Sequence, residues 1–176
     1  TDYDEGFDVE ISGGFTYVVG QTKATSITPF PCQPSGGLYN DNTYDGTYDG
    51  FIAAFRNSTG SLAWSTYYGG SNNDIIHCIE SDNAGGVYFH GTTTSANIYI
   101  PSNPPSGLYT QSNNGSGETF LGRIVKSVND LDWVTYFGGT SSDNSVAIDT
   151  YKDQSVYITG AGNIAGNSFP TNPGIV

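Results

Sequence analysis

The stretch that decides the fold is Leu62-Ala63-Trp64-Ser65-Thr66-Tyr67-Tyr68-Gly69-Gly70, because it returns 69 residues later as Leu131-Asp132-Trp133-Val134-Thr135-Tyr136-Phe137-Gly138-Gly139. A second block occurs three times at a similar spacing, as Tyr17-Val18-Val19-Gly20, Tyr88-Phe89-His90-Gly91 and Tyr157-Ile158-Thr159-Gly160. Both blocks indicate one internal repeat of about 70 residues. The chain therefore holds about two and a half units, bounded at about 1–70, 71–139 and 140–176, in a single segment.

Each unit is predicted to contain four β-strands, because runs rich in Val, Ile, Tyr, Phe and Trp alternate with turn residues. In the central unit these runs cover 75–81, 86–92, 118–126 and 131–137. Four short antiparallel strands per repeat are typical of a β-propeller blade. The sequence predicts an all-β fold of propeller blades, with too few units for a closed ring.

Composition excludes several classes of partner. The 176 residues carry 17 Asp and Glu but only 5 Lys and Arg, which gives a net charge of -12. Such a chain repels phosphate groups, so nucleic acid and anionic membranes are poor partners. No apolar run approaches the roughly 18 residues of a membrane-spanning helix.

Several strings resemble the bacterial SBBP, or seven-bladed β-propeller, repeat family. They are Trp64-Ser65-Thr66-Tyr67-Tyr68-Gly69-Gly70, Asp49-Gly50-Phe51-Ile52-Ala53-Ala54-Phe55, Gly86-Val87-Tyr88-Phe89-His90-Gly91 and Phe169-Pro170-Thr171-Asn172-Pro173-Gly174. The resemblance covers essentially the whole chain. It implies a secreted or surface-exposed repeat protein, often one part of a large bacterial surface polypeptide, with no enzymatic activity shared by the family.

Acidic residues recur at two positions of the repeat. One set follows the Gly-Gly segment and contains Asp4, Asp74 and Asp143, and the other ends the first strand and contains Glu10, Glu80 and Asp149. Repetition favours a structural role, in which these carboxylates accept hydrogen bonds from backbone N–H groups in turns. Rings of carboxylates that hold cations around one face of the propeller are the alternative.

The repeated aromatic and glycine positions also have two interpretations. Trp64 and Trp133 are expected to pack between blades, and a sugar-binding platform is the alternative. The glycines that follow, Gly69, Gly70, Gly138 and Gly139, are expected to form the turn between blades with a positive φ.

Two features occur in only one unit and are therefore candidates for function. If the turn at 82–85 pairs Ser81 with Gly86, His77 falls opposite His90, close enough to share a transition metal or to stack. Asp41, Thr43 and Asp45 resemble the start of a Ca²⁺ loop, although Ile52 stands where the twelfth-position Glu is expected. A solvated acidic turn is the alternative, and no other cofactor is predicted.

The sequence predicts a non-enzymatic protein, because it contains no nucleophile elbow, phosphate-binding loop or zinc-protease motif. We expect an extracellular scaffold, fibre component or adhesin on a bacterial surface, whose partners are other blades of the same polypeptide or identical subunits. A carbohydrate- or protein-binding module is the alternative, because the loops 21–48 and 93–117 are longer than a blade requires. A propeller hydrolase ranks third.

Overall fold

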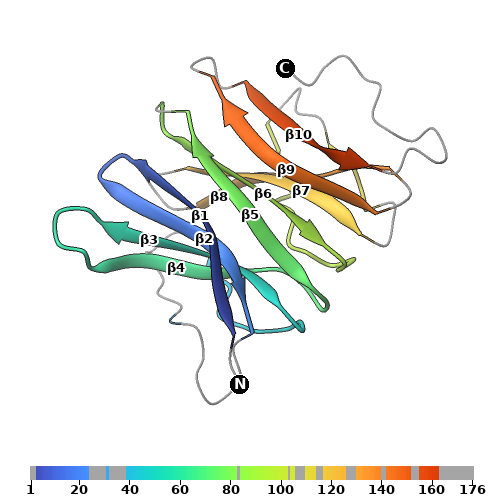
Figure 1. Ribbon diagram of the computed structural model, residues 1–176, viewed down its shortest axis with the longest axis horizontal. Coiled ribbons are helices and arrows are strands. Elements are labelled where there is room, and N and C mark those ends of the chain that lie inside the picture. The colour runs from blue at the N-terminus through green and yellow to red at the C-terminus, as the bar shows by residue number, and fades with distance from the viewer. Residues whose placement is uncertain are drawn as a thin grey trace.

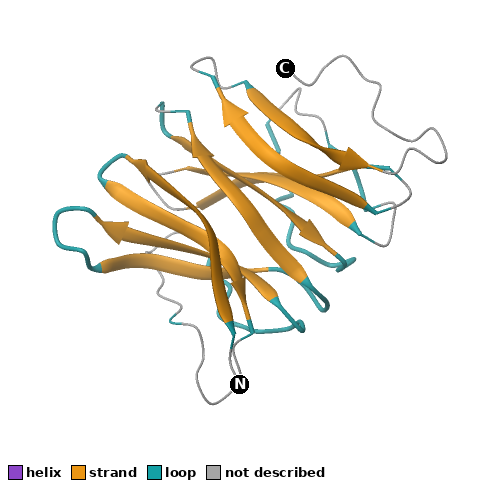
Figure 2. Ribbon diagram, viewed as in Figure 1, coloured by secondary structure: helices purple, strands orange, loops and turns teal. Residues whose placement is uncertain are grey.

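Antiparallel strands in three sheets make up the described part of the chain (Figure 1). The computed structural model describes residues 3–23, 31, 39–82, 84–102, 104–105, 110–113, 117–125, 130–139, 142–151 and 155–162, with only the backbone of 143–146 and 162. No helix occurs within these ranges (Figure 2). The predicted all-β class is confirmed.

Two of the sheets are four-stranded meanders, in which neighbouring strands follow chain order. The first blade consists of β1 (Asp4–Ser12), β2 (Phe15–Thr22), β3 (Asp49–Arg56) and β4 (Leu62–Tyr68). The second blade consists of β5 (Asp74–Ser81), β6 (Gly86–Thr93), β7 (Glu118–Val125) and β8 (Asp130–Phe137). The third sheet is a hairpin of β9 (Asp143–Thr150) and β10 (Val156–Gly162). The strands predicted for the central unit are confirmed to within one residue at each end.

The sheets stack so that their first strands contact one another in chain order, β1 with β5 and β5 with β9 (Figure 1). We call these three strands the inner strands. We call the face of a sheet that points to the next sheet its forward face, and the opposite face its rear face. Between the two blades lies a buried cluster that includes Tyr17, Ile52, Trp64 and Tyr68 from the first blade and Ile76, Ile79, Val87, Phe89 and Phe120 from the second. Between the second blade and the hairpin, Tyr88, Leu121 and Trp133 pack against Ile148, Val156 and Ile158. Trp64 and Trp133 therefore lie on equivalent forward faces.

A β-bulge interrupts the first strand of every unit at the same repeat position. The extra residues are Phe7, His77 and Val146. Each bulge adjoins the glycine that closes the repeated Tyr-x-x-Gly block, namely Gly20, Gly91 and Gly160. A Cβ atom on Gly20 would lie 1.9 Å from the carbonyl oxygen of Glu5, and one on Gly91 would lie 1.9 Å from that of Ile75. The repeated glycine is required because the bulged strand brings its backbone this close.

The expectation that Gly69, Gly70, Gly138 and Gly139 adopt a positive φ is wrong. Among the described glycines, a positive φ occurs at Gly13, Gly14, Gly60 and Gly85. A Cβ atom on Gly70 would instead lie 2.6 Å from Oδ1 of Asn97 and 2.8 Å from Cβ of Ser95. The absence of a side chain at Gly70 thus serves close packing against the loop that follows β6.

Candidate functional site

Buried carboxylates gather where the third strand of each blade begins. In the first blade, Thr22 pairs with Asp4 on one side and with Asp49 on the other. In the second blade, Thr93 pairs in the same way with Asp74 and Glu118. Asp49, Asp74 and Glu118 are all at most 2% exposed. Both blades therefore contain the same row across their first three strands, in which a threonine lies between two acidic residues. This row places ionisable groups between the stacked sheets.

Asp74 is held by donors from its own blade and from the turn before it. Its Oδ2 accepts a hydrogen bond of 2.7 Å from the N–H of Gly70 and one of 2.8 Å from the hydroxyl of Ser95, and its Oδ1 accepts one from the hydroxyl of Thr93. Burial raises the pKa of Asp74, and these hydrogen bonds oppose the rise. In the first blade Asp4 accepts the equivalent hydrogen bond from the hydroxyl of Thr22. The side chain of Asp143 lies outside the described residues.

Asp49 is a buried carboxylate whose two oxygens differ in their hydrogen bonding. Its Oδ2 accepts a hydrogen bond of 3.0 Å from the N–H of Asp45, whereas its Oδ1 is buried and has no hydrogen-bond partner. Burial raises the pKa of Asp49 to about 7; the Asp45 N–H opposes the rise, and the negative charges of Asp74, Asp41 and Asp45 add to it. Asp49 is therefore poised to gain or lose a proton near neutral pH.

The residues of the predicted Ca²⁺ loop do lie together. Oδ1 of Asp41 accepts hydrogen bonds from the N–H and the hydroxyl of Thr43, at 2.9 and 2.7 Å, and the Thr43 hydroxyl lies 3.4 Å from Oδ2 of Asp45. These are the contacts of an Asx turn. In the part of the chain that the structure describes, no three His, Cys, Asp or Glu residues are arranged to hold a metal ion.

The second set of repeated acids lies along the inner strands. The hydroxyl of Ser81 donates a hydrogen bond of 2.5 Å to Oε1 of Glu10, which links β5 to β1. Burial raises the pKa of Glu80, and the charges of Glu10 and Asp149 raise it further. Carboxylates of three successive inner strands are thus near enough to repel one another.

The predicted register of the central hairpin is wrong. Ser81 pairs with Val87 rather than Gly86, so Cys78, not His77, lies opposite His90. His77 is the bulge residue of β5, and its Nε2 shares a hydrogen bond of 2.9 Å with the hydroxyl of Thr92. The two imidazole rings remain neighbours, with centroids 6.3 Å apart. Burial lowers the pKa of both histidines, that of His90 to about 4, so both are neutral at pH 7.

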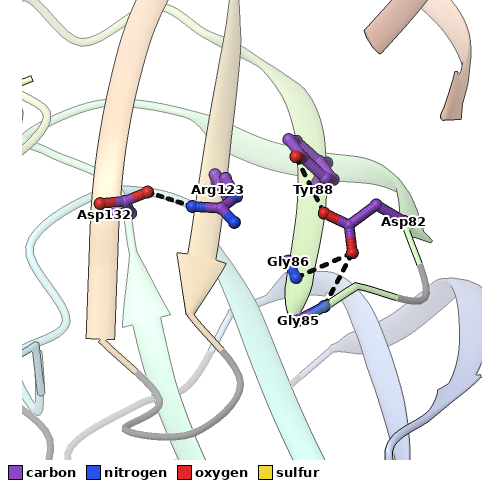
Figure 3. Close-up of polar contacts among 6 residues, drawn as sticks. All are labelled: Asp82, Gly85, Gly86, Tyr88, Arg123 and Asp132. Carbon is purple, nitrogen blue, oxygen red and sulfur yellow. Dashed lines mark hydrogen bonds and ion pairs between the residues drawn. The ribbon is translucent and has the colours of Figure 1, made fainter. Parts of the chain in front are cut away.

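The register is displaced because Asp82 organises a longer turn (Figure 3). Its Oδ1 accepts hydrogen bonds of 2.7 to 3.0 Å from the N–H groups of Ala84, Gly85 and Gly86, and its Oδ2 accepts one of 3.1 Å from the hydroxyl of Tyr88. Burial alone would raise the pKa of Asp82, but these donors and the nearby Arg123 hold it below its usual value.

Arg123 connects this turn to the outer strand of the second blade. It forms an ion pair with Asp132, and its guanidinium group lies 5.6 Å from the ring centroid of Tyr88 (Figure 3). Ala54 and Ala63 stand at the equivalent positions of the first blade. The network is specific to the second blade, where it fixes Tyr88 against Trp133, at 6.1 Å between centroids.

Five residues of these networks were not predicted from the sequence as candidate site residues, namely Asp49, Glu118, Asp82, Arg123 and Tyr88. A signal existed for the first two, because both are acids that open the third strand of their units, 69 residues apart. No protein-family model matches this chain, and no curated protein matches it.

Proposed function

We propose that this chain is a non-enzymatic, extracellular repeat module of a bacterial surface, whose blades act as a scaffold or adhesin. The observation that supports this function best is the use of repeated aromatic positions. Tyr17 and Tyr88, like Trp64 and Trp133, are buried on forward faces, against the sheet that follows. The large aromatic area of each blade is therefore used to hold the next blade in place.

Surface chemistry supports an extracellular role. The net charge of -12 keeps such a chain soluble and away from nucleic acid. The resemblance to SBBP repeats, carried by Trp64–Gly70 and Asp49–Phe55, favours the same location. Within the described residues, no helix is long and apolar enough to cross a membrane.

The location can be tested with antibodies raised against the folded chain. We expect these antibodies to label intact cells of the source organism, or its culture medium, and external protease to remove the label from cells. Permeabilised cells and a cytoplasmic marker protein serve as controls. Label that appears only after permeabilisation would exclude a role as surface scaffold or adhesin.

A specific contact also favours the second candidate function, carbohydrate binding. The two long loops meet at the rings of Tyr39 and Tyr99, which are tilted against each other with centroids 5.2 Å apart and an interplanar angle of 30°. Tyr99 is 53% exposed, and its carbonyl oxygen accepts a hydrogen bond of 2.9 Å from the hydroxyl of Tyr68, which fixes the loop. An exposed aromatic ring on a fixed loop suits the apolar face of a sugar.

Glycan-array screening of the folded chain tests this second function. If the loops bind sugar through Tyr99, the Tyr99→Ala variant is expected to weaken binding about 2- to 13-fold, since one stacked ring contributes roughly 0.5–1.5 kcal/mol. Tyr151→Ala removes a similarly exposed tyrosine outside these loops and is the matched control. Equal loss in both variants, or no glycan bound by the native chain, would argue against the site.

A further inference from the structure

Two sheet faces at opposite ends of the described chain expose large apolar or aromatic side chains. On the rear face of the second blade, Ile79 and Ser81 of β5 are only 2% and 3% exposed, because the first blade covers them. Their equivalents on the rear face of the first blade are Val9 and Ile11 of β1, which are 58% and 67% exposed. These two repeat positions are therefore buried between the blades in β5. In β1, where both residues are apolar, they are exposed.

The forward faces show the complementary pattern. Tyr17 and Tyr88 are 0% and 1% exposed, since each packs against the sheet that follows its own. The third member of this set is Tyr157 on β10, which is 60% exposed. Tyr157 is therefore exposed on the hairpin at the repeat position where Tyr17 and Tyr88 pack against the next sheet.

The internal contacts show what such a junction needs. Besides apolar packing, Oδ2 of Asp8 accepts a hydrogen bond of 3.0 Å from the N–H of Ile79, and the hydroxyl of Thr150 donates one of 3.0 Å to the carbonyl oxygen of Ser81. Within the described residues, the β9–β10 hairpin forms the second of these junctions, with Ile148, Val156 and Ile158 packed against the second blade.

We propose that the chain associates head to tail with a second copy of itself, the forward face of the β9–β10 hairpin of one copy docking on the rear face of β1 of the other. Tyr157 then takes the place that Tyr17 has in the internal junction, and Val9 and Ile11 take the places of Ile79 and Ser81. A second copy is the occupant that fits, because one molecule exposes both halves of a single type of junction at opposite ends (Figure 1). This inference rests on the proposed role of the blades as packing modules.

A head-to-tail contact joins two different surfaces, which gives it a distinctive test. Ile11→Asp blocks only the rear face and Tyr157→Asp blocks only the forward face. Each variant alone is expected to stay monomeric, with dissociation constants weakened about 10- to 100-fold by the lost burial. An equimolar mixture is expected to form a dimer and nothing larger, because each variant retains one intact face. The native chain is expected to form larger assemblies.

Analytical ultracentrifugation of the 176-residue chain measures these outcomes, in about 1 M NaCl to screen the net negative charge over about 3 Å. Ile100→Asp, which adds a charge at a partly exposed loop isoleucine, is the matched control and should associate like the native chain. Val9→Asp replaces Ile11→Asp if circular dichroism shows that the latter is unfolded.

Three outcomes overturn the docking: a native chain that stays monomeric at millimolar concentration, blocked variants that associate like the native chain, or a mixture without dimers. A monomeric chain that antibodies still detect at the cell surface would exclude the docking and leave the proposed function intact. Association of a chain found only inside cells would exclude the surface function alone.

Discussion

Replacing Gly20 with alanine is expected to lower the free energy of unfolding by about 3 kcal/mol or more, a large share of the roughly 5–15 kcal/mol of an ordinary domain. The new Cβ would lie 1.9 Å from the carbonyl oxygen of Glu5 and 2.8 Å from Cε1 of Phe51. The Glu5 oxygen belongs to the backbone and cannot move without breaking the pairing of β1 with β2. Urea denaturation followed by tryptophan fluorescence measures the loss.

The chain supplies its own control across the same pair of strands. Gly6 is the direct partner of Gly20, but a Cβ on Gly6 would meet nothing closer than Cγ1 of Val18, at 3.7 Å. Gly6→Ala is therefore expected to change stability by no more than about 1 kcal/mol, towards a more stable fold. If both variants unfold at the same urea concentration, the bulge does not explain the glycine. Gly91→Ala repeats the test in the second blade, where the oxygen of Ile75 lies equally close.

The contrast between these glycines shows how far the sequence alone can be interpreted. The repeat predicts the strands within one residue, because apolar alternation and turn residues are local properties of the chain. The register of β5 against β6 was predicted one residue out. The side chain of Asp82 lengthens the turn, and the bulge at His77 then restores the pairing of Asp74 with Thr93. The longer turn and the bulge each shift the register by one residue, in opposite directions. The alternation of apolar and polar residues in the sequence therefore does not reveal either shift.

The candidate site was predicted only in part for a different reason. Repetition identified Asp74 as a structural acid, and its bond from the N–H of Gly70 agrees with that role. Asp49 and Glu118 differ in residue type, and their side chains are buried only once the strands have paired and the sheets have stacked. Burial of this kind is a tertiary property, so neither composition nor spacing could have indicated the raised pKa of Asp49.

The second large effect that we expect is a pH dependence of stability, which follows from the raised pKa of Asp49. An unfolded chain releases this proton at its ordinary pKa of 3.8, whereas the folded chain keeps it until about pH 7. Between these values the folded state binds more protons, so stability falls as the pH rises through this window. By pH 7 the free energy of unfolding has fallen by on the order of 4 kcal/mol through this group, and the loss stays constant above that pH.

Asp49→Asn removes the titration and is therefore expected to stabilise the protein at pH 8 by up to about 4 kcal/mol relative to pH 4. The amide oxygen can still accept the hydrogen bond from the N–H of Asp45. Urea denaturation of both proteins at the two pH values measures the difference. Asp130→Asn controls for net charge, because it removes one negative charge and keeps an oxygen that can accept the 2.9 Å hydrogen bond from the N–H of Leu131. If Asp49→Asn shifts stability equally at both pH values, the pKa of this carboxyl group is the same in the folded and the unfolded chain, and burial does not raise it.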